Sequence, residues 1–120
     1  ITDRKQAEEA LRESEERFRK AFDDAPIGMS LVSATGQFLR ANTVYCNMMG
    51  YSEAELLQMT FQEITHPDDL KADLEGVRQM MTGELRALEM EKRYITKQGQ
   101  IIPAIMRTAP IRSEEGNILY

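Results

Sequence analysis

Apolar positions repeat along this chain with two periods, close to 3.5 residues at the start and 2 residues near the end. In the first part, positions at alternating steps of four and three predict an amphipathic helix with a coiled-coil seam. Acidic side chains stand four positions before basic ones beside this seam, which stabilises a helix by about 0.2–0.5 kcal/mol per pair. The seam positions are Ala7, Leu11, Ser14, Phe18 and Ala21.

This first helix has two interpretations. It either packs on the domain that follows, or it is a linker helix that dimerises through its seam, as the coiled-coil spacing favours. The seam is short and holds a serine, so any coiled coil would be weak alone. Pro26 biases Ala25 away from helical geometry, and the helix is therefore expected over residues 1–23.

A hairpin and a short helix are predicted next. Strands are expected from Met29 to Ser33 and from Gln37 to Ala41, with a turn at Thr35-Gly36. Asn42 stands where it can cap a helix from Thr43 to Met49, since its side chain can accept a backbone N–H. Gly50 then occupies the position where a left-handed residue commonly ends a helix.

Three more helices follow, each with a start signal. Ser52 and Glu55 have the spacing of a capping box, and Thr60 and Glu63 repeat it. His66 precedes a proline and two carboxylates, which suit the first turn of a longer helix. The buried stripe expected for that helix is Leu70, Leu74, Val77 and Met81.

The remaining third has the two-residue period of strands. Strands are expected from Leu88 to Tyr94 and from Ile101 to Arg112, and residues 117–120 begin another. Pro103 removes one backbone donor, so it should lie beside a bulge or on an unpaired side. Ile105 belongs to a face too apolar to be left to water, and the first helix or a second subunit should cover it.

Two strands, four helices and three strands predict an α+β fold, an antiparallel sheet with helices on one face. This order, with its motifs, resembles the PAS domain family over about residues 24–120. The residues that carry the resemblance are Asn42, Gly50-Tyr51-Ser52, Glu55-Leu56, His66-Pro67-Asp68-Asp69, Glu91, Arg93, Gly99 and Gly116.

The resemblance implies a five-stranded antiparallel sheet. It divides the chain into a linker helix at 1–23, similar to those that join successive PAS domains, and a PAS domain at 24–120 with an incomplete last strand. In the family that strand lies between the first strand and the long one. The chain is therefore expected to be an internal segment of a multidomain protein.

Composition and charge limit the partners and the location that can be expected. A net charge of −5 argues against nucleic acid as a partner, because neutralising phosphates needs concentrated Lys and Arg. No apolar run is long enough for a membrane span, and the single cysteine fits a reducing compartment, so a cytoplasmic location is expected. The parent protein could still be anchored in a membrane.

Enzymatic and metal chemistry are weakly supported. Cys46 lies among apolar residues on a short helix, where a structural thiol is expected, and His66 has a capping role. No third group is in place to orient the histidine as a base. His66, Asp68 and Asp69 are too close in sequence to form a metal shell, and no second cluster completes one. We therefore expect a regulatory domain without catalytic or metal-binding residues.

The resemblance to PAS domains also indicates which cofactors to expect. Members of the family that the chain resembles bind haem, flavins, small carboxylic acids and other ligands, or nothing. The cysteine motif of the flavin photosensors lies on a later helix and is absent here, since Cys46 precedes Asn47 and Met48. One haem-binding branch uses a histidine on the long helix, and none occurs between Lys71 and Thr82. The sequence thus argues against both cofactors and leaves any other unknown.

The predicted pocket is apolar with a few polar groups, as small-ligand sites usually are. The alternative is that the same side chains fill an ordinary core, because eight methionines suit either an adaptable pocket or a loose core. The candidate residues are Tyr45, Met48, Leu56, Ile64, Leu74, Val77, Met81, Leu88, Met90, Tyr94, Ile102, Ala104, Met106 and Thr108.

The sequence thus predicts a module of a bacterial-type signalling protein. It would sense a small ligand or relay a conformational signal through flanking helices to an effector such as a histidine kinase or a diguanylate cyclase. The alternative is a ligand-free dimerisation domain. A homodimer is expected through the seam of the first helix and the outer sheet face at Ile105, with neighbouring PAS or effector domains in the same chain.

Overall fold

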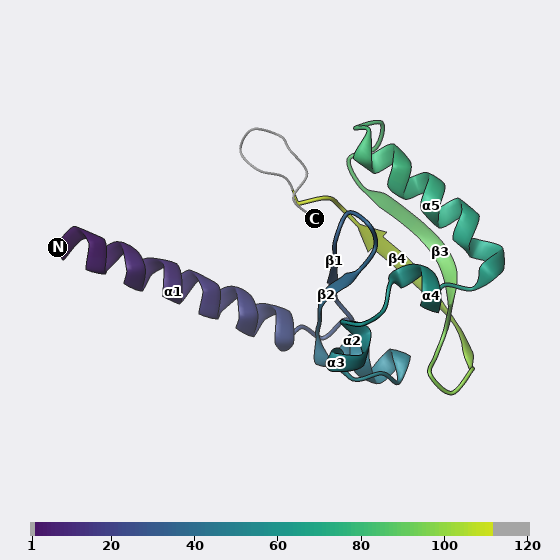
Figure 1. Ribbon diagram of the computed structural model, residues 1–120, viewed down its shortest axis with the longest axis horizontal. Coiled ribbons are helices and arrows are strands. Elements are labelled where there is room, and N and C mark those ends of the chain that lie inside the picture. The colour runs from purple at the N-terminus through teal and green to yellow at the C-terminus, as the bar shows by residue number, and fades with distance from the viewer. Residues whose placement is uncertain (1, 112–120) are drawn as a thin grey trace.

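The computed structural model describes residues 2–111, and its first element stands apart from the others (Figure 1). Helix α1, Thr2–Asp23, extends away from the rest of the chain and reaches it through its last turn, where Phe22 is buried. Leu11 and Phe18 of the predicted seam are 61% and 51% exposed. The predicted helix is confirmed, and nothing among the described residues covers its seam.

Four strands within the described residues form two antiparallel pairs. β1, Ser30–Val32, pairs with β2, Phe38–Ala41, while β3, Leu88–Ile95, pairs with β4, Ile101–Thr108, in an unbroken register. The α+β fold with antiparallel strands is confirmed. The predicted fifth strand, over residues 117–120, lies outside the described residues, as does the expected end of β4 at residue 112.

Pro103 lies within a regular ladder, opposite Arg93. The backbone oxygen of Arg93 accepts from His66, and its N–H donates to Asp69, so both groups point away from β4. In an antiparallel pair, the residue opposite then also points its nitrogen away from its partner. Pro103 therefore lies on an unpaired side, the second of the two predicted arrangements, and needs no bulge.

Four helices connect the hairpins, as predicted: α2, Thr43–Met49; α3, Glu53–Leu56; α4, Phe61–Ile64; and α5, Pro67–Met81. Asn42, the Ser52–Glu55 capping box and His66 all cap as expected, and Gly50 has a φ of 79°. The second predicted capping box is wrong. The Thr60 hydroxyl lies 3.4 Å from the carboxylate of Glu63 and does not cap α4.

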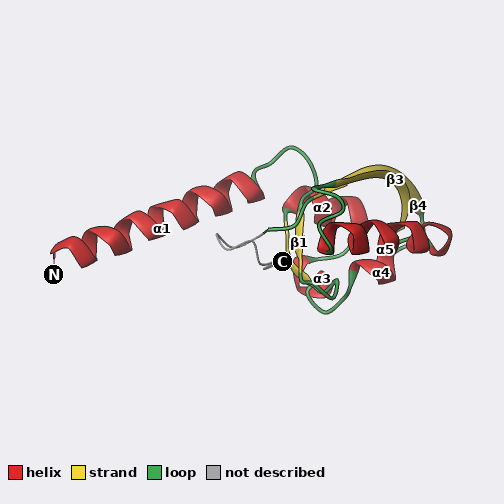
Figure 2. Cartoon of the chain, turned by 90° about the horizontal axis from the view of Figure 1, so that it is seen from above, coloured by secondary structure: helices red, strands yellow, loops and turns green. Residues whose placement is uncertain are grey.

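The buried face of α5 is the main correction to the predicted core. Asp73, Gly76 and Met80 are its buried residues, whereas Leu74 is 40% exposed and Met81 is 39% exposed. Figure 2 shows α5 alongside the β3–β4 hairpin. A Cβ on Gly76 would lie 2.6 Å from Leu88 Cδ2, so this glycine allows a close approach between α5 and β3. The helix is rotated so that its glycine and its ion-paired aspartate face the strand.

The core lies between the hairpins and the short helices. Its central members come from five elements and are all nearly inaccessible to solvent. Burying one of the large apolar side chains among them contributes about 1.5–3 kcal/mol. They are Phe38, Ala41, Tyr45, Met49, Leu56, Ile64 and Tyr94.

Candidate functional site

A cavity of about 330 Å³ lies among β1, α2, α5 and the strands β3 and β4. The lining residues are mostly apolar, and they come from segments that are far apart in sequence. Eight residues of the predicted pocket are among them, so the sequence located much of this wall. They are Tyr45, Met48, Val77, Met81, Tyr94, Ala104, Met106 and Thr108.

Six predicted pocket residues do not line the cavity. Leu56 and Ile64 are buried in the core around Phe38, and Ile102 packs against the same cluster. Leu74 faces solvent because of the rotation of α5. Leu88 lies against Gly76. Met90 shares the inward face of β3 with Lys92 and Tyr94 but is not part of the lining.

A buried ion pair in the cavity wall was missed by the sequence-based prediction. Lys92 Nζ lies 2.5 Å from Asp73 Oδ2 and 3.1 Å from Thr65 Oγ1, and the side chains of the ion pair are each 1% exposed. The ammonium also lies 4.6 Å from the ring centroid of Tyr94 and 5.3 Å from that of Phe61. The two-residue period of β3 would have placed Lys92 inward, on the same face as Tyr94.

Burial controls the protonation of the polar groups in this wall. Burial lowers the pKa of Lys92, while the hydrogen bond and charge of Asp73 oppose that shift. Burial raises the pKa of Tyr94 to about 12, with a smaller contribution from the negative charge of Asp73. Burial also raises the pKa of Tyr45. Both phenols are therefore neutral hydroxyls at physiological pH.

The residues weighed for catalysis are not arranged for it. Burial, assisted by the charge of Glu53, raises the pKa of the Cys46 thiol, which disfavours the nucleophilic thiolate. His66 Nδ1 accepts from the N–H of Asp68, 3.1 Å away, as a helix cap. Within residues 2–111, no group of three His, Cys, Asp or Glu side chains is placed to hold a metal ion.

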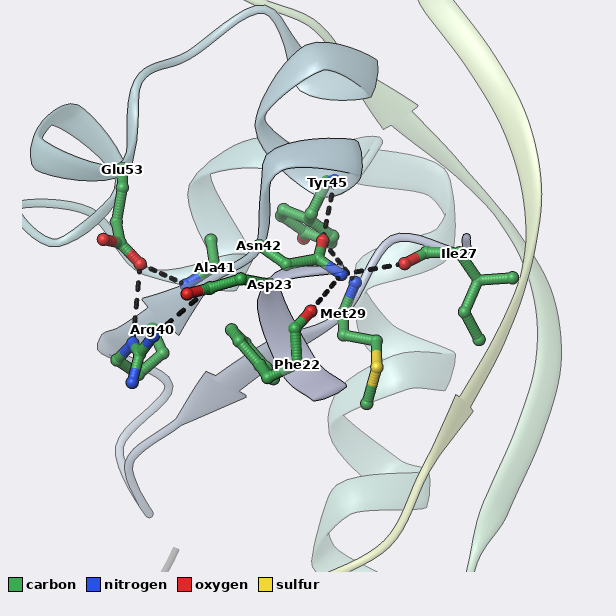
Figure 3. Close-up of polar contacts among 9 residues, drawn as sticks. All are labelled: Phe22, Asp23, Ile27, Met29, Arg40, Ala41, Asn42, Tyr45 and Glu53. Carbon is green, nitrogen blue, oxygen red and sulfur yellow. Dashed lines mark hydrogen bonds and ion pairs between the residues drawn. The ribbon is translucent and has the colours of Figure 1, made fainter. Parts of the chain in front are cut away.

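Asn42 connects the cavity wall to the end of α1 (Figure 3). Its fully buried side chain accepts from the N–H groups of Met29 and Tyr45, at 3.0 and 2.9 Å. Its amide nitrogen donates to the carbonyls of Phe22 and Ile27, both at 2.9 Å. Ile27, Met29 and Tyr45 line the cavity, while Phe22 is in the last turn of α1. The side chain of Asn42 thus connects the cavity lining to the last turn of α1.

A second, partly exposed cluster lies beside this junction. Arg40 Nη2 is 3.3 Å from Asp23 Oδ1, and Arg40 Nε is 3.7 Å from Glu53 Oε2. The guanidinium also lies 5.1 Å from the ring centroid of Phe22. The carboxylate of Glu53 accepts from the N–H of Ala41 as well, at 2.9 Å. Arg40 therefore links the end of α1 to β2 and α3.

Known proteins agree with this architecture. The probable diguanylate cyclase DgcE of Escherichia coli (strain K12) is 40% identical over 110 residues, which is 92% of this chain and 10% of that protein. The sensor histidine kinase TmoS of Ectopseudomonas mendocina is 24% identical over 93 residues, which is 78% of this chain and 10% of that protein. The chain thus spans about a tenth of these curated relatives. Their names agree with the predicted signal-transduction module.

A solved structure has a similar fold, and a family profile matches this chain. The PAS domain of a protein from Colwellia psychrerythraea superimposes with a TM-score of 0.79 at 19% identity, covering 87% of each chain. Among residues 2–111, no helix has the length and apolar character needed to cross a membrane. The profile of the family described as the PAS fold matches residues 38–120, and the chain belongs to this family.

Proposed function

We propose that this chain is a sensory PAS domain whose cavity takes a small ligand and whose first helix passes the resulting change to neighbouring domains. One observation carries the proposal. The segments that line the cavity at Ile27, Met29 and Tyr45 share the side chain of Asn42 with the last turn of α1. A ligand that moves these segments therefore acts on the attachment of α1.

The relay requires two arrangements of this junction. A ligand shifts an equilibrium only when it binds one arrangement better than the other. The Arg40 cluster lies partly exposed at the surface, so its ion pairs can be exchanged at low cost. The buried hydrogen bonds of Asn42 are harder to replace, because each unsatisfied buried group costs about 1–3 kcal/mol. The ion pairs of Arg40 are then the contacts that differ between the two arrangements, while the hydrogen bonds of Asn42 are kept in both.

The effector that we propose is a diguanylate cyclase domain in the same longer chain, with a histidine kinase as the alternative. The 40% identity to a protein named as a probable diguanylate cyclase supports the first choice. The domain itself is regulatory, and any catalysis belongs to the effector. We place it in the cytoplasm, where its single cysteine stays reduced.

Ligand sensing is tested by native mass spectrometry of the 120-residue chain, combined with thermal shifts against a library of small metabolites. A bound molecule, or a compound that raises the melting temperature through the cavity, supports sensing. Replacing Val77 with Trp should fill the cavity and abolish that shift. A chain that is empty and unaffected by every compound would overturn ligand sensing.

A ligand-free dimerisation domain is the second candidate, and the exposed apolar residues favour it. Leu11 and Phe18 on α1 and Ile105 on β4 are all more than half exposed. Leu11→Glu should weaken self-association in sedimentation velocity, while Arg12→Glu places the same carboxylate beside the seam as a control. An unchanged dimer in Leu11→Glu, or a monomeric parent chain, would exclude the seam as an interface.

A further inference from the structure

The charged groups that line the cavity cancel one another. Lys92 and Asp73 form a close pair, and this pair is neutral as a unit whether the shared proton lies on the amine or on the carboxyl. Arg107, the other charged residue of the lining, has a side chain that is 76% exposed, and it pairs with Glu89 at 3.1 Å. The lining therefore offers a ligand neither an unpaired positive charge nor an unpaired negative charge.

Uncharged oxygen atoms provide the remaining polar groups. The hydroxyls of Ser30, Tyr45 and Tyr94 belong to the lining, and burial keeps both phenols neutral. A hydroxyl can both donate and accept one hydrogen bond, so it suits a ligand alcohol or carbonyl equally.

A charged ligand would be disfavoured at this wall. A carboxylate close to Lys92 would also lie close to Asp73, whose attraction for the ammonium it would have to replace. An ammonium close to Asp73 would meet Lys92 in the same way. A buried charge without its own counterion is strongly unfavourable, because the interior screens it far less than water does. The paired residues thus exclude both kinds of ion.

We infer that the cavity selects an uncharged amphipathic molecule, with a hydroxyl or carbonyl group at one end and a short apolar body. The volume of about 330 Å³ lies at the lower end of the range for ligand sites and fits a small molecule. The apolar body would contact Val77, Met80 and Met106, and the polar end would contact the tyrosine hydroxyls. This inference rests on the proposed ligand-sensing function and specifies its ligand class.

Three probes with the same seven-carbon chain test the selection by charge. Heptan-1-ol, heptanoate and heptylamine differ only in the end group, and at pH 7 the second is an anion and the third a cation. Isothermal titration of the 120-residue chain should give a dissociation constant for heptan-1-ol at least about tenfold below those of the two ions.

Two substitutions should change the selected charge in opposite directions. Asp73→Asn leaves the charge of Lys92 unpaired and should make heptanoate the best ligand. Lys92→Met leaves Asp73 unpaired and should favour heptylamine. The double variant Asp73→Asn/Lys92→Met removes both charges and should again prefer heptan-1-ol. A purely structural ion pair would leave the ranking of the three probes unchanged in every variant that folds.

A smaller substitution tests the inferred ligand class if a charge variant fails to fold. Tyr94→Phe removes one oxygen atom and should weaken heptan-1-ol several-fold without strengthening either ion. Tighter binding of heptanoate or heptylamine to the unaltered chain would overturn the ligand class and leave ligand sensing intact. If no probe binds and the metabolite library also gives no shift, both the ligand class and ligand sensing are overturned.

Discussion

The two long helices, α1 and α5, are both amphipathic, yet they are attached to the rest of the chain in different ways. α5 is attached to β3 along its length by Asp69, Asp73 and Gly76. Within residues 2–111, α1 is attached through its last turn, by Phe22 and Asp23, and Leu11 stays in solvent. An apolar stripe shows that a helix needs a partner, whereas polar and steric contacts decide whether the partner lies in the same chain.

Removing the central attachment of α5 should have the largest effect on stability. Asp73→Ala leaves the Lys92 ammonium buried without its carboxylate, which costs about 3–5 kcal/mol of unfolding free energy. Urea denaturation followed by circular dichroism measures the loss. The double variant Asp73→Leu/Lys92→Met should be far less destabilised, because no unpaired charge remains. Equal losses in both variants would show that packing, and not charge, holds α5 at this point.

Two adjacent methionines test the rotation of α5. Met80 is 6% exposed, whereas Met81, which the sequence pattern placed in the buried stripe, is 39% exposed. Met80→Ala should therefore cost about 2–4 kcal/mol and Met81→Ala less than about 1 kcal/mol in the same unfolding measurement. A larger loss of stability in Met81→Ala than in Met80→Ala would mean that α5 buries the face predicted from periodicity.

The attachment of α1 can be weakened separately from the core. Asn42→Asp keeps the acceptor that caps α2 but removes the donors to Phe22 and Ile27, at a cost of about 1–3 kcal/mol. Hydrogen exchange should speed up in the last turn of α1 more than in α2. Ser52→Ala is the control, because it removes a cap of α3 without touching this junction. Equal exchange in both variants would mean that Asn42 does not hold α1.

The smallest expected effect concerns the outer attachment of α5. Hydrogen bonds from the Arg93 side chain and backbone hold the pKa of Asp69 at about 2, below its ordinary value of 3.8. The unfolded chain therefore takes up this proton first, and stability is lost as the pH falls from about 4 towards about 2. Asp69→Asn should flatten that part of a stability–pH curve measured by thermal unfolding. An unchanged slope would assign the acid sensitivity to other carboxyls.

Local signals in the sequence predicted most of the fold. Asn42, Gly50, the Ser52–Glu55 box and His66 mark helix ends through contacts with nearby backbone groups, and each lies where its pattern indicates. Thr60 shows the limit of the same rule. Its hydroxyl donates to the Glu63 carboxylate, 3.4 Å away, and accepts no hydrogen bond from the first turn of α4, a difference in side-chain geometry that a four-residue motif does not reveal.

The cavity was only partly predictable because its wall depends on contacts between distant segments. Lys92 and Asp73 are 19 residues apart, and only the packing of α5 on β3 turns two charged residues into one buried pair. Gly76 has no side chain and therefore adds nothing to an apolar pattern, although it allows the close approach to Leu88. Leu74 and Met81 were placed inward by periodicity alone, and these contacts turn them outward.

The attachment of α1 through its last turn, as seen in the described part of the chain, also has a mechanical consequence. A helix of 22 residues is about 33 Å long, so a tilt of about 10° at its end moves the opposite end by about 6 Å. In the proposed function, the helix would therefore act as a lever that turns about Asn42. A movement too small to alter the packing around the cavity is thus enlarged at the far end of α1.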